Sequence, residues 1–181
     1  MKHNFTLKMA ATSFCMLLSV TLISCGGGSS TDSSASSTNS APASNTVAVG
    51  QPLKTDYFEV TVNKVSTTQS IKDPSGLGMH VKADPGTKLL VLNVTFKNTD
   101  SESRMAMDGS VHFNYGGKDY NFDNSETLMI DGYGLFLDQL NPLISKTTNL
   151  VYKIPAEVNG EAYYNPGRAD SDERITLGNI Q

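Results

Sequence analysis

The sequence predicts an all-β fold, an antiparallel β-sandwich, for one domain that spans residues 47–181. Apolar and polar residues alternate with period two in several short runs of this region, as half-buried strands require. Turn-forming glycine, proline and asparagine residues separate these runs at moderate spacing, which is typical of a sandwich. The runs lack the 3.6-residue period of amphipathic helices, so the domain is predicted to be built from strands.

The first predicted strands are residues 57–65 and 87–96. In the first, YFEVTVNKV, every second residue is apolar and is expected to face the core: Phe58, Val60 and Val62. In the second, TKLLVLNVTF, the expected inward residues are Leu90, Leu92, Val94 and Phe96. Leu89 and Val91 make the first half of this second strand apolar on both faces, which predicts a strand at the centre of a sheet.

Residues 111–122, VHFNYGGKDYNF, predict a β-hairpin. Two alternating runs flank Gly116 and Gly117, and both positions of a tight hairpin turn favour glycine because they need positive φ. The alternating side chains are Val111, Phe113 and Tyr115 before the turn and Tyr120 and Phe122 after it.

Two more strands are predicted near the end of the chain. Residues 147–155, TTNLVYKIP, end near a proline and are expected to turn Leu150, Tyr152 and Ile154 inward. Residues 173–180, ERITLGNI, predict a last short strand through Ile175 and Leu177. The intervening residues 126–142 are apolar but contain Gly132 and Gly134, so they are consistent with one short helical turn or with an irregular crossover.

Residues 1–24 have the pattern of a secretory signal peptide. Lys2 and Lys8 form a basic beginning, and residues 9–23 form an apolar segment. This segment is shorter than the roughly 20 residues that a transmembrane helix needs. The sequence therefore favours a removed signal peptide over a retained membrane helix.

The last signal residues and the next cysteine, LISC at 22–25, resemble the bacterial lipobox. The resemblance implies that Cys25 is joined to diacylglycerol, with acyl chains such as palmitate, and becomes the mature N-terminus. Two acyl chains anchor a protein durably, because each buried methylene contributes about 0.8 kcal/mol. We expect a lipid anchor in the cell membrane or outer membrane, on its extracytoplasmic face. The alternative is an ordinary signal peptide with a chance cysteine.

Residues 25–46 form the predicted lipidated N-terminus and linker, since residues 26–45 contain glycine, serine and other small or polar residues but no large apolar side chain. Such a segment cannot bury enough surface to order itself, and it is interpreted as a spacer; a glycosylated or protein-binding stalk is the alternative. Loss of Lys2 and Lys8 leaves 12 basic and 18 acidic residues, a net charge near −6. This balance argues against nucleic acid as a partner.

Four segments resemble the telokin-like bacterial lipoprotein domain, a family of unknown function. They are VGQPLKTDYFEVTVNKV, ADPGTKLLVLNVTFKNTDSE, GGKDY and LVYKIP, which together extend over most of residues 47–181. The resemblance implies an immunoglobulin-like sandwich and no catalytic residues. The Cys-Trp-Cys core of antibody domains is absent, because the chain has no Trp. One departure is Leu143 in LNPLISK, where the family has the glycine of a Pro-Gly turn.

The residues that carry enzyme chemistry are sparse after processing. Cys15 leaves with the signal peptide and acylation consumes Cys25, so the mature chain has no thiol nucleophile, disulfide or Cys-based zinc site. His80 and His112 are the histidines that remain, and the common hydrolase and nucleotide-binding motifs are absent. Asp131, Asp138 and the acids of residues 169–173 are interpreted as solvated. We assign no catalytic, cofactor-binding or metal-binding residue.

The predicted function is a non-catalytic binding or interaction module of the cell envelope, with membrane lipid and an unknown protein or envelope component as partners. The loop at residues 72–86 is one candidate surface, because it carries Leu77 and Met79 among glycines. An extracytoplasmic copper-binding protein is the alternative, since thioethers and imidazoles suit copper. Its candidate ligands are Met79, His80, Met105, Met107 and His112. An envelope hydrolase is a second, weaker alternative.

Overall fold

A computed structural model describes residues 45–73, 80–123, 125–135 and 137–181. The predicted signal peptide, Cys25 and all of the linker up to residue 44 lie outside these residues. The described part contains thirteen strands and no helix, which confirms the all-β prediction. None of its segments is a helix long and apolar enough to cross a membrane.

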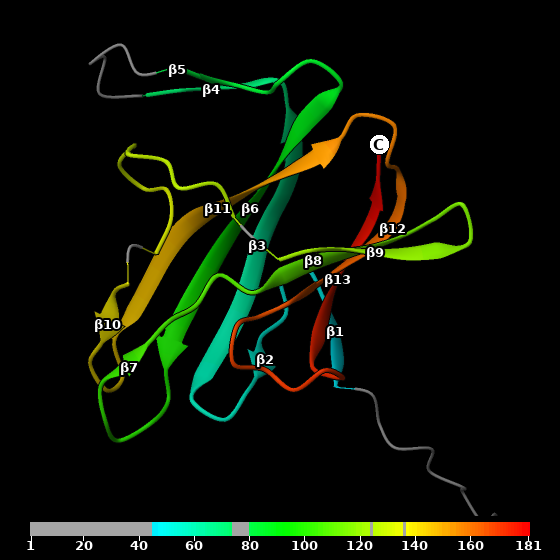
Figure 1. The fold of residues 1–181 in the computed structure, drawn as a ribbon. Coiled ribbons are helices and arrows are strands. Elements are labelled where there is room, and N and C mark those ends of the chain that lie inside the picture. Colours follow the sequence, from blue (N-terminus) through cyan, green and yellow to red (C-terminus); the bar gives the residue numbers. More distant parts are fainter. Residues whose placement is uncertain (1–44, 74–79, 124, 136) are drawn as a thin grey trace, which may run out of the picture. The chain divides into compact units, whose positions relative to one another are not determined.

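Two larger sheets form the sandwich (Figure 1). The five-stranded sheet has the order β1 (Thr46–Ala48), β13 (Arg174–Ile180), β12 (Gly160–Asn165), β8 (Ser110–Tyr115) and β9 (Lys118–Phe122). The four-stranded sheet has the order β11 (Ser145–Pro155), β6 (Thr87–Asn98), β3 (Phe58–Thr68) and β2 (Leu53–Lys54). All neighbouring strands in both sheets are antiparallel except β1, which pairs with β13 in parallel.

Two short ladders lie beside these sheets. One joins β7 (Arg104–Met105) to β10 (Gln139–Leu140), and the other joins β4 (Ser70–Lys72) to β5 (His80–Lys82). The sequence did not predict either ladder, and it also missed β1, β2 and β12. These strands are short or carry aromatic residues on both faces, so their apolar alternation is weak.

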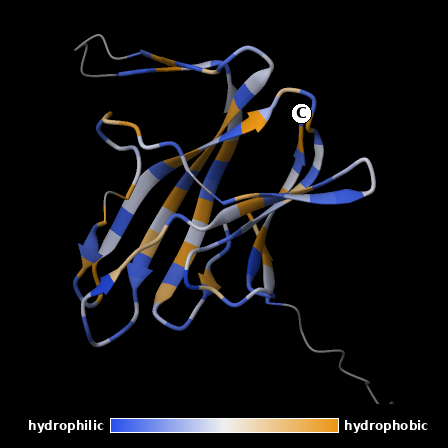
Figure 2. Ribbon diagram, in the orientation of Figure 1, coloured by the Kyte–Doolittle hydropathy of each residue, from blue (hydrophilic) through white to orange (hydrophobic). Residues whose placement is uncertain are grey.

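The main core lies between the two sheets, and it contains predicted inward residues from five of the six predicted strands. The alternation of hydrophobic and hydrophilic residues is visible along β3 and β6 (Figure 2). The buried members are Phe58, Val60, Val62, Leu90, Leu92, Val94, Phe96, Val111, Phe113, Leu150, Tyr152, Ile154, Ile175 and Leu177. The predicted phase is therefore correct in β3, β6, β8, β11 and β13. In β9, Phe122 is only partly buried against this core and Tyr120 is 41% exposed.

A second apolar cluster explains why the first half of β6 is apolar on both faces. Leu89 and Val151 lie on the outer face of the four-stranded sheet, and Ile71, Leu128 and Ile130 cover them. β6 pairs with β11 on one side and β3 on the other, so it occupies the predicted central position.

The crossover at residues 126–142 is irregular in its described part, and it contains β10 but no helical turn. It follows the edge of β11, because the amide of Glu126 donates to the carbonyl of Val151 at 2.6 Å and the amide of Gly134 donates to that of Asn149 at 2.9 Å. Of the two alternatives left by the sequence, the irregular crossover is correct.

Two turns depend on positive φ angles. Gly116 and Gly117 have φ angles of 59° and 75°, as the predicted hairpin turn requires. Leu143, which stands where the resembled family has glycine, has a φ of 64°. The glycine-like backbone is therefore retained at that turn although the residue is leucine.

Candidate functional site

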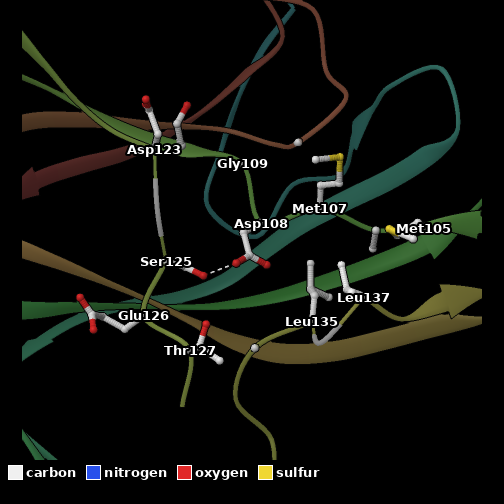
Figure 3. A pocket seen from close by; sticks show the side chains of 14 residues that line it. Met105, Met107, Asp108, Gly109, Asp123, Ser125, Glu126, Thr127, Leu135 and Leu137 are labelled. Carbon is white, nitrogen blue, oxygen red and sulfur yellow. Dashed lines mark hydrogen bonds between the residues drawn. The ribbon is translucent and has the colours of Figure 1, made fainter. Parts of the chain in front are cut away.

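A pocket of about 710 Å³ opens beside β7 and the beginning of β8 (Figure 3). Its wall comes from described residues within 105–110, 123–127 and 134–137 and from Gly167. The lining residues are Met105, Ala106, Met107, Asp108, Gly109, Ser110, Asp123, Ser125, Glu126, Thr127, Gly134, Leu135, Leu137 and Gly167. Pockets of 300–1,000 Å³ are the usual size for small-molecule sites, so this one has room for an organic ligand.

Two buried tyrosines hold the wall at Asp108. The hydroxyl of Tyr164 donates to the backbone carbonyl of Asp108 at 2.5 Å, and that of Tyr152 donates to the same carbonyl at 2.9 Å. Burial raises the pKa of both phenols well above the usual value, with smaller contributions from neighbouring groups. Both hydroxyls therefore remain protonated donors over the whole physiological pH range.

Two glycines bring this wall close to the segment that follows β12. A Cβ on Gly109 would lie 2.3 Å from the carbonyl oxygen of Asn165, and the φ of Gly109 is 75°. A Cβ on Gly167 would lie 2.5 Å from the Cβ of Met107. Any larger residue at either position would push the two segments apart, so the backbone beside the pocket is closely fitted.

One half of the pocket is lined by oxygen atoms (Figure 3). The hydroxyl of Ser125 donates to the carboxylate of Asp108. Glu126 lies 3.4 Å from the ammonium of Lys153, which also binds Asp84 at 3.0 Å. Hydrogen bonding to Asp84, followed by the charge of Glu126, raises the pKa of Lys153. Glu126 thus has a cationic partner outside the pocket, Lys153, which it shares with Asp84.

Asp108 and Asp123 lack such a partner. Within the described residues, neither carboxylate forms an ion pair with Lys or Arg. The described residues that line the pocket include no Lys, Arg or His. The polar half therefore carries uncompensated negative charge, and a concave surface of one sign attracts ligands of the opposite sign.

The other half of the pocket is apolar (Figure 3). Leu135 is buried, whereas Met107 and Leu137 expose 48% and 78% of their surface at the rim. Leu137 also has a φ of 59°, a conformation that costs about 1–2 kcal/mol for a residue with a Cβ. A leucine exposed to this extent contributes little to the core, so its apolar surface is available at the entrance of the pocket.

The structure brings only part of the candidate copper ligands together. Met105 and Met107 line the pocket, but neither histidine does. His80 belongs to the exposed β5, and Met79, like Leu77, lies outside the described residues. Where residues are described, no group of three or more His, Cys, Asp or Glu is placed to hold a metal ion.

His112 lies on the outer face of the five-stranded sheet, as its alternation with Val111 and Phe113 predicts. Its ring stacks on that of Tyr163, with the ring centroids 4.6 Å apart. The guanidinium of Arg174 lies 4.7 Å from the centroid of the same Tyr163 ring. Ser110 and His112 share a hydrogen bond of 2.9 Å. Burial lowers the pKa of His112. The imidazole is thus engaged in surface packing.

The acidic residues that we interpreted as solvated, Asp131, Asp138 and those of residues 169–173, are not among the residues that line the pocket. Asp131 is exposed, and Asp138 forms an ion pair with Lys146. Among residues 169–173, the carboxylate of Glu173 accepts a hydrogen bond of 2.9 Å from the backbone amide of Asp170. These groups are local features of turns and loops.

Sequence reasoning missed Asp108, Asp123, Ser125 and Leu137 as pocket residues. The pairing register of the predicted hairpin could have indicated three of them, Asp108, Asp123 and Ser125. β8 and β9 pair Val111 with Phe122. One further step of that register places Ser110 opposite Asp123, and three steps place Asp108 opposite Ser125. The Ser125–Asp108 hydrogen bond follows this register beyond the end of the hairpin.

Residues 47–171 match the family described as a domain of unknown function, DUF4352. An uncharacterized β-sandwich protein from Clostridium difficile 630 is similar in structure, with a TM-score of 0.53, 15% identity and coverage of 76% of this chain and 94% of that chain. The yjhA protein from Bacillus subtilis has a TM-score of 0.50, 20% identity and coverage of 72% and 99%. At these identities the likeness shows the fold alone. No curated protein has significant similarity to the chain.

Proposed function

The chain belongs to the DUF4352 family, and we propose that its domain is a non-catalytic binding module of the cell envelope that uses the pocket beside Asp108 as its binding site. The pocket itself carries this proposal. It has the volume of a ligand site, and its wall is fixed by buried hydrogen bonds and by closely packed glycines. A wall that is ordered before binding reduces the entropy lost on binding.

The proposal includes the finer features that the sequence indicates. The domain is an immunoglobulin-like, telokin-like sandwich, held on the extracytoplasmic face of a membrane by the lipid on Cys25 and spaced from it by the linker. The tether raises the effective concentration of the domain near partners at the membrane or in the wall. The LISC motif at residues 22–25 supports the anchor.

The polar groups of the pocket support binding rather than catalysis. Ser125 donates directly to Asp108, and no imidazole lies between them to take up its proton. A serine nucleophile needs a base of suitable pKa, usually histidine, within hydrogen-bond reach. The two histidines of the mature chain are not among the lining residues.

Photocrosslinking in living cells tests the proposal. The photoreactive residue p-benzoylphenylalanine replaces Leu137 at the pocket rim or Leu143 elsewhere on the surface. These leucines form a matched pair, because they expose 78% and 75% of their surface and both have positive φ. We expect a reproducible crosslinked partner or ligand at position 137 and none at 143. Crosslinks that are equal at both positions, or that occur only at 143, would contradict the proposal.

Copper binding is the second candidate, and one observation favours it: Met105 and Met107 line the same pocket. Thioethers suit monovalent copper. Titration of the protein with copper, monitored by the melting temperature, tests this function, with Met107→Ala as the comparison. A shift in melting temperature that Met107→Ala abolishes would place copper first. The absence of any shift would remove this candidate.

A further inference from the structure

We infer that the pocket beside Asp108 takes a primary ammonium group carried on an aliphatic chain. This inference rests on the proposed function, because it names the class of ligand for the same site. Three features of the described lining residues lead to it: the division of the pocket into an apolar and a polar half, the negative charge of the polar half, and the hydrogen-bond acceptors around that charge.

The ligand must be amphipathic, because the pocket is divided. Met105, Met107, Leu135 and Leu137 offer thioether and aliphatic surface on one side. Carboxylates and hydroxyls line the other side, at Asp108, Asp123, Ser125 and Thr127. Methionine side chains adapt their shape to different aliphatic partners. A ligand with an apolar body and one strongly polar end would satisfy both sides.

The polar end must be positive. Asp108 and Asp123 carry charges that no Lys or Arg of the described residues neutralises, while Glu126 is already paired with Lys153. An anionic ligand would meet repulsion from both free carboxylates. A cation would form charge-assisted hydrogen bonds with them, which are about twice as strong as neutral ones.

The type of cation follows from the side chains around it. Quaternary ammonium groups are usually bound by aromatic cages, and the residues described as lining this pocket include no Phe, Tyr or Trp. The lining groups near the charge are instead hydrogen-bond acceptors, which need donors. A primary ammonium group supplies three donors, so it suits these acceptors. Free aliphatic amines and lysine side chains of a peptide share this chemistry.

The rim fits the same ligand. Leu137 and Met107 hold apolar surface in solvent at the entrance, and the backbone of Leu137 is strained. An aliphatic chain that enters the pocket would cover both side chains. The apolar surface of Leu137 and Met107 would then be removed from water, which favours an aliphatic ligand.

Isothermal titration calorimetry of the full chain in zwitterionic nanodiscs tests the inference, with empty nanodiscs as the blank. The probes are 1,8-diaminooctane, 1,8-octanediol and octanedioate, which share a chain length and differ in charge. We expect saturable binding of the diamine, weaker binding of the diol and none of the dicarboxylate. Binding of the diamine should weaken with added salt, since exposed charges are screened.

Two variants locate the charge. Asp123→Asn should weaken diamine binding by about tenfold, the effect of one lost charge-assisted hydrogen bond. Asp119→Asn removes an exposed carboxylate from the neighbouring strand β9, outside the pocket, and should leave the affinity unchanged. An equal loss in both variants would mean that the diamine responds only to overall charge, which would overturn the inference.

The probes also separate the inference from the proposed function. If the diol binds as tightly as the diamine, the pocket binds ligands but the ammonium assignment is wrong. If no probe binds while photocrosslinking at position 137 succeeds, the assignment is again wrong and the binding module stands. If a lysine-containing peptide binds and the free diamine binds more weakly, the inference stands and the source of the ammonium group is a protein.

Discussion

The phenol of Tyr164 donates a hydrogen bond of 2.5 Å to the backbone carbonyl of Asp108, a residue 56 positions away in sequence. This bond joins the buried interior of the five-stranded sheet to the wall of the pocket. Tyr164→Phe should lower the free energy of unfolding by about 1–1.5 kcal/mol, because the carbonyl keeps only the bond from Tyr152. Urea unfolding measures the change. Tyr120→Phe, at a more exposed hydroxyl, is the control and should have no effect.

Leu143→Gly should stabilise the domain by about 1 kcal/mol. Glycine removes the cost of the positive φ, which exceeds the extra chain entropy that it adds to the unfolded state. The leucine exposes 75% of its surface, so little burial is lost. Thermal unfolding tests this expectation. A decrease in melting temperature would show that Leu143 makes a stabilising contact that outweighs its backbone strain.

Leu92→Asp should unfold the domain, because an unpaired buried carboxylate costs several kcal/mol and total stabilities are about 5–15 kcal/mol. Leu92 is fully buried in the main core. Asn93→Asp is the matched control on the opposite face of β6, where Asn93 donates to Asn149 at 2.9 Å. It should cost about 1 kcal/mol. Circular dichroism at increasing urea concentration distinguishes the two, and similar unfolding midpoints would contradict the assigned faces.

Stability should fall as the pH falls from 7 to 5, in part because of His112. Burial lowers the pKa of His112; Asp123 and Asp119 oppose this effect and Arg174 adds to it. The unfolded chain therefore takes up a proton before the folded domain does. The stabilisation contributed by neutral His112 is present at pH 7 and is lost between the unfolded pKa, near 6.5, and the lower folded pKa.

His112→Gln should make the free energy of unfolding less dependent on pH in this range. Chemical unfolding at pH 7 and pH 5 gives the difference for each protein. If the variant loses as much stability as the original chain between these two pH values, His112 does not carry the predicted dependence.

The sequence allowed the core to be predicted because burial acts on every second residue of a strand. From Leu90 to Phe96 this alternation is unbroken, and all of its inward residues are buried. β12 was missed because Tyr163 is aromatic on the outer face and Tyr164 is aromatic on the inner face, so hydropathy does not separate them. The parallel pairing of β1 with β13 depends on backbone hydrogen bonds, which leave no side-chain pattern.

The pocket was only partly predictable. Met105 and Met107, two of the five candidate copper ligands, line the pocket, and the register of the predicted hairpin extends to the Asp108–Ser125 pair. Leu137 could not be found in this way, because its position depends on the irregular path of the crossover along β11. Its positive φ is likewise a property of the folded backbone that no residue type in the sequence reveals.

Methyl NMR of the full chain labelled at the methionine methyl groups tests the central claim, that the pocket beside Asp108 binds a primary ammonium group on an aliphatic chain, most directly. Met105 and Met107 line the pocket, whereas Met129 exposes 79% of its surface outside it and serves as the internal control. On titration with 1,8-diaminooctane, the account predicts saturable shifts of the Met105 and Met107 methyl signals and an unmoved Met129 signal. Equal shifts of all three signals, or no shift of the Met105 and Met107 signals, would contradict it.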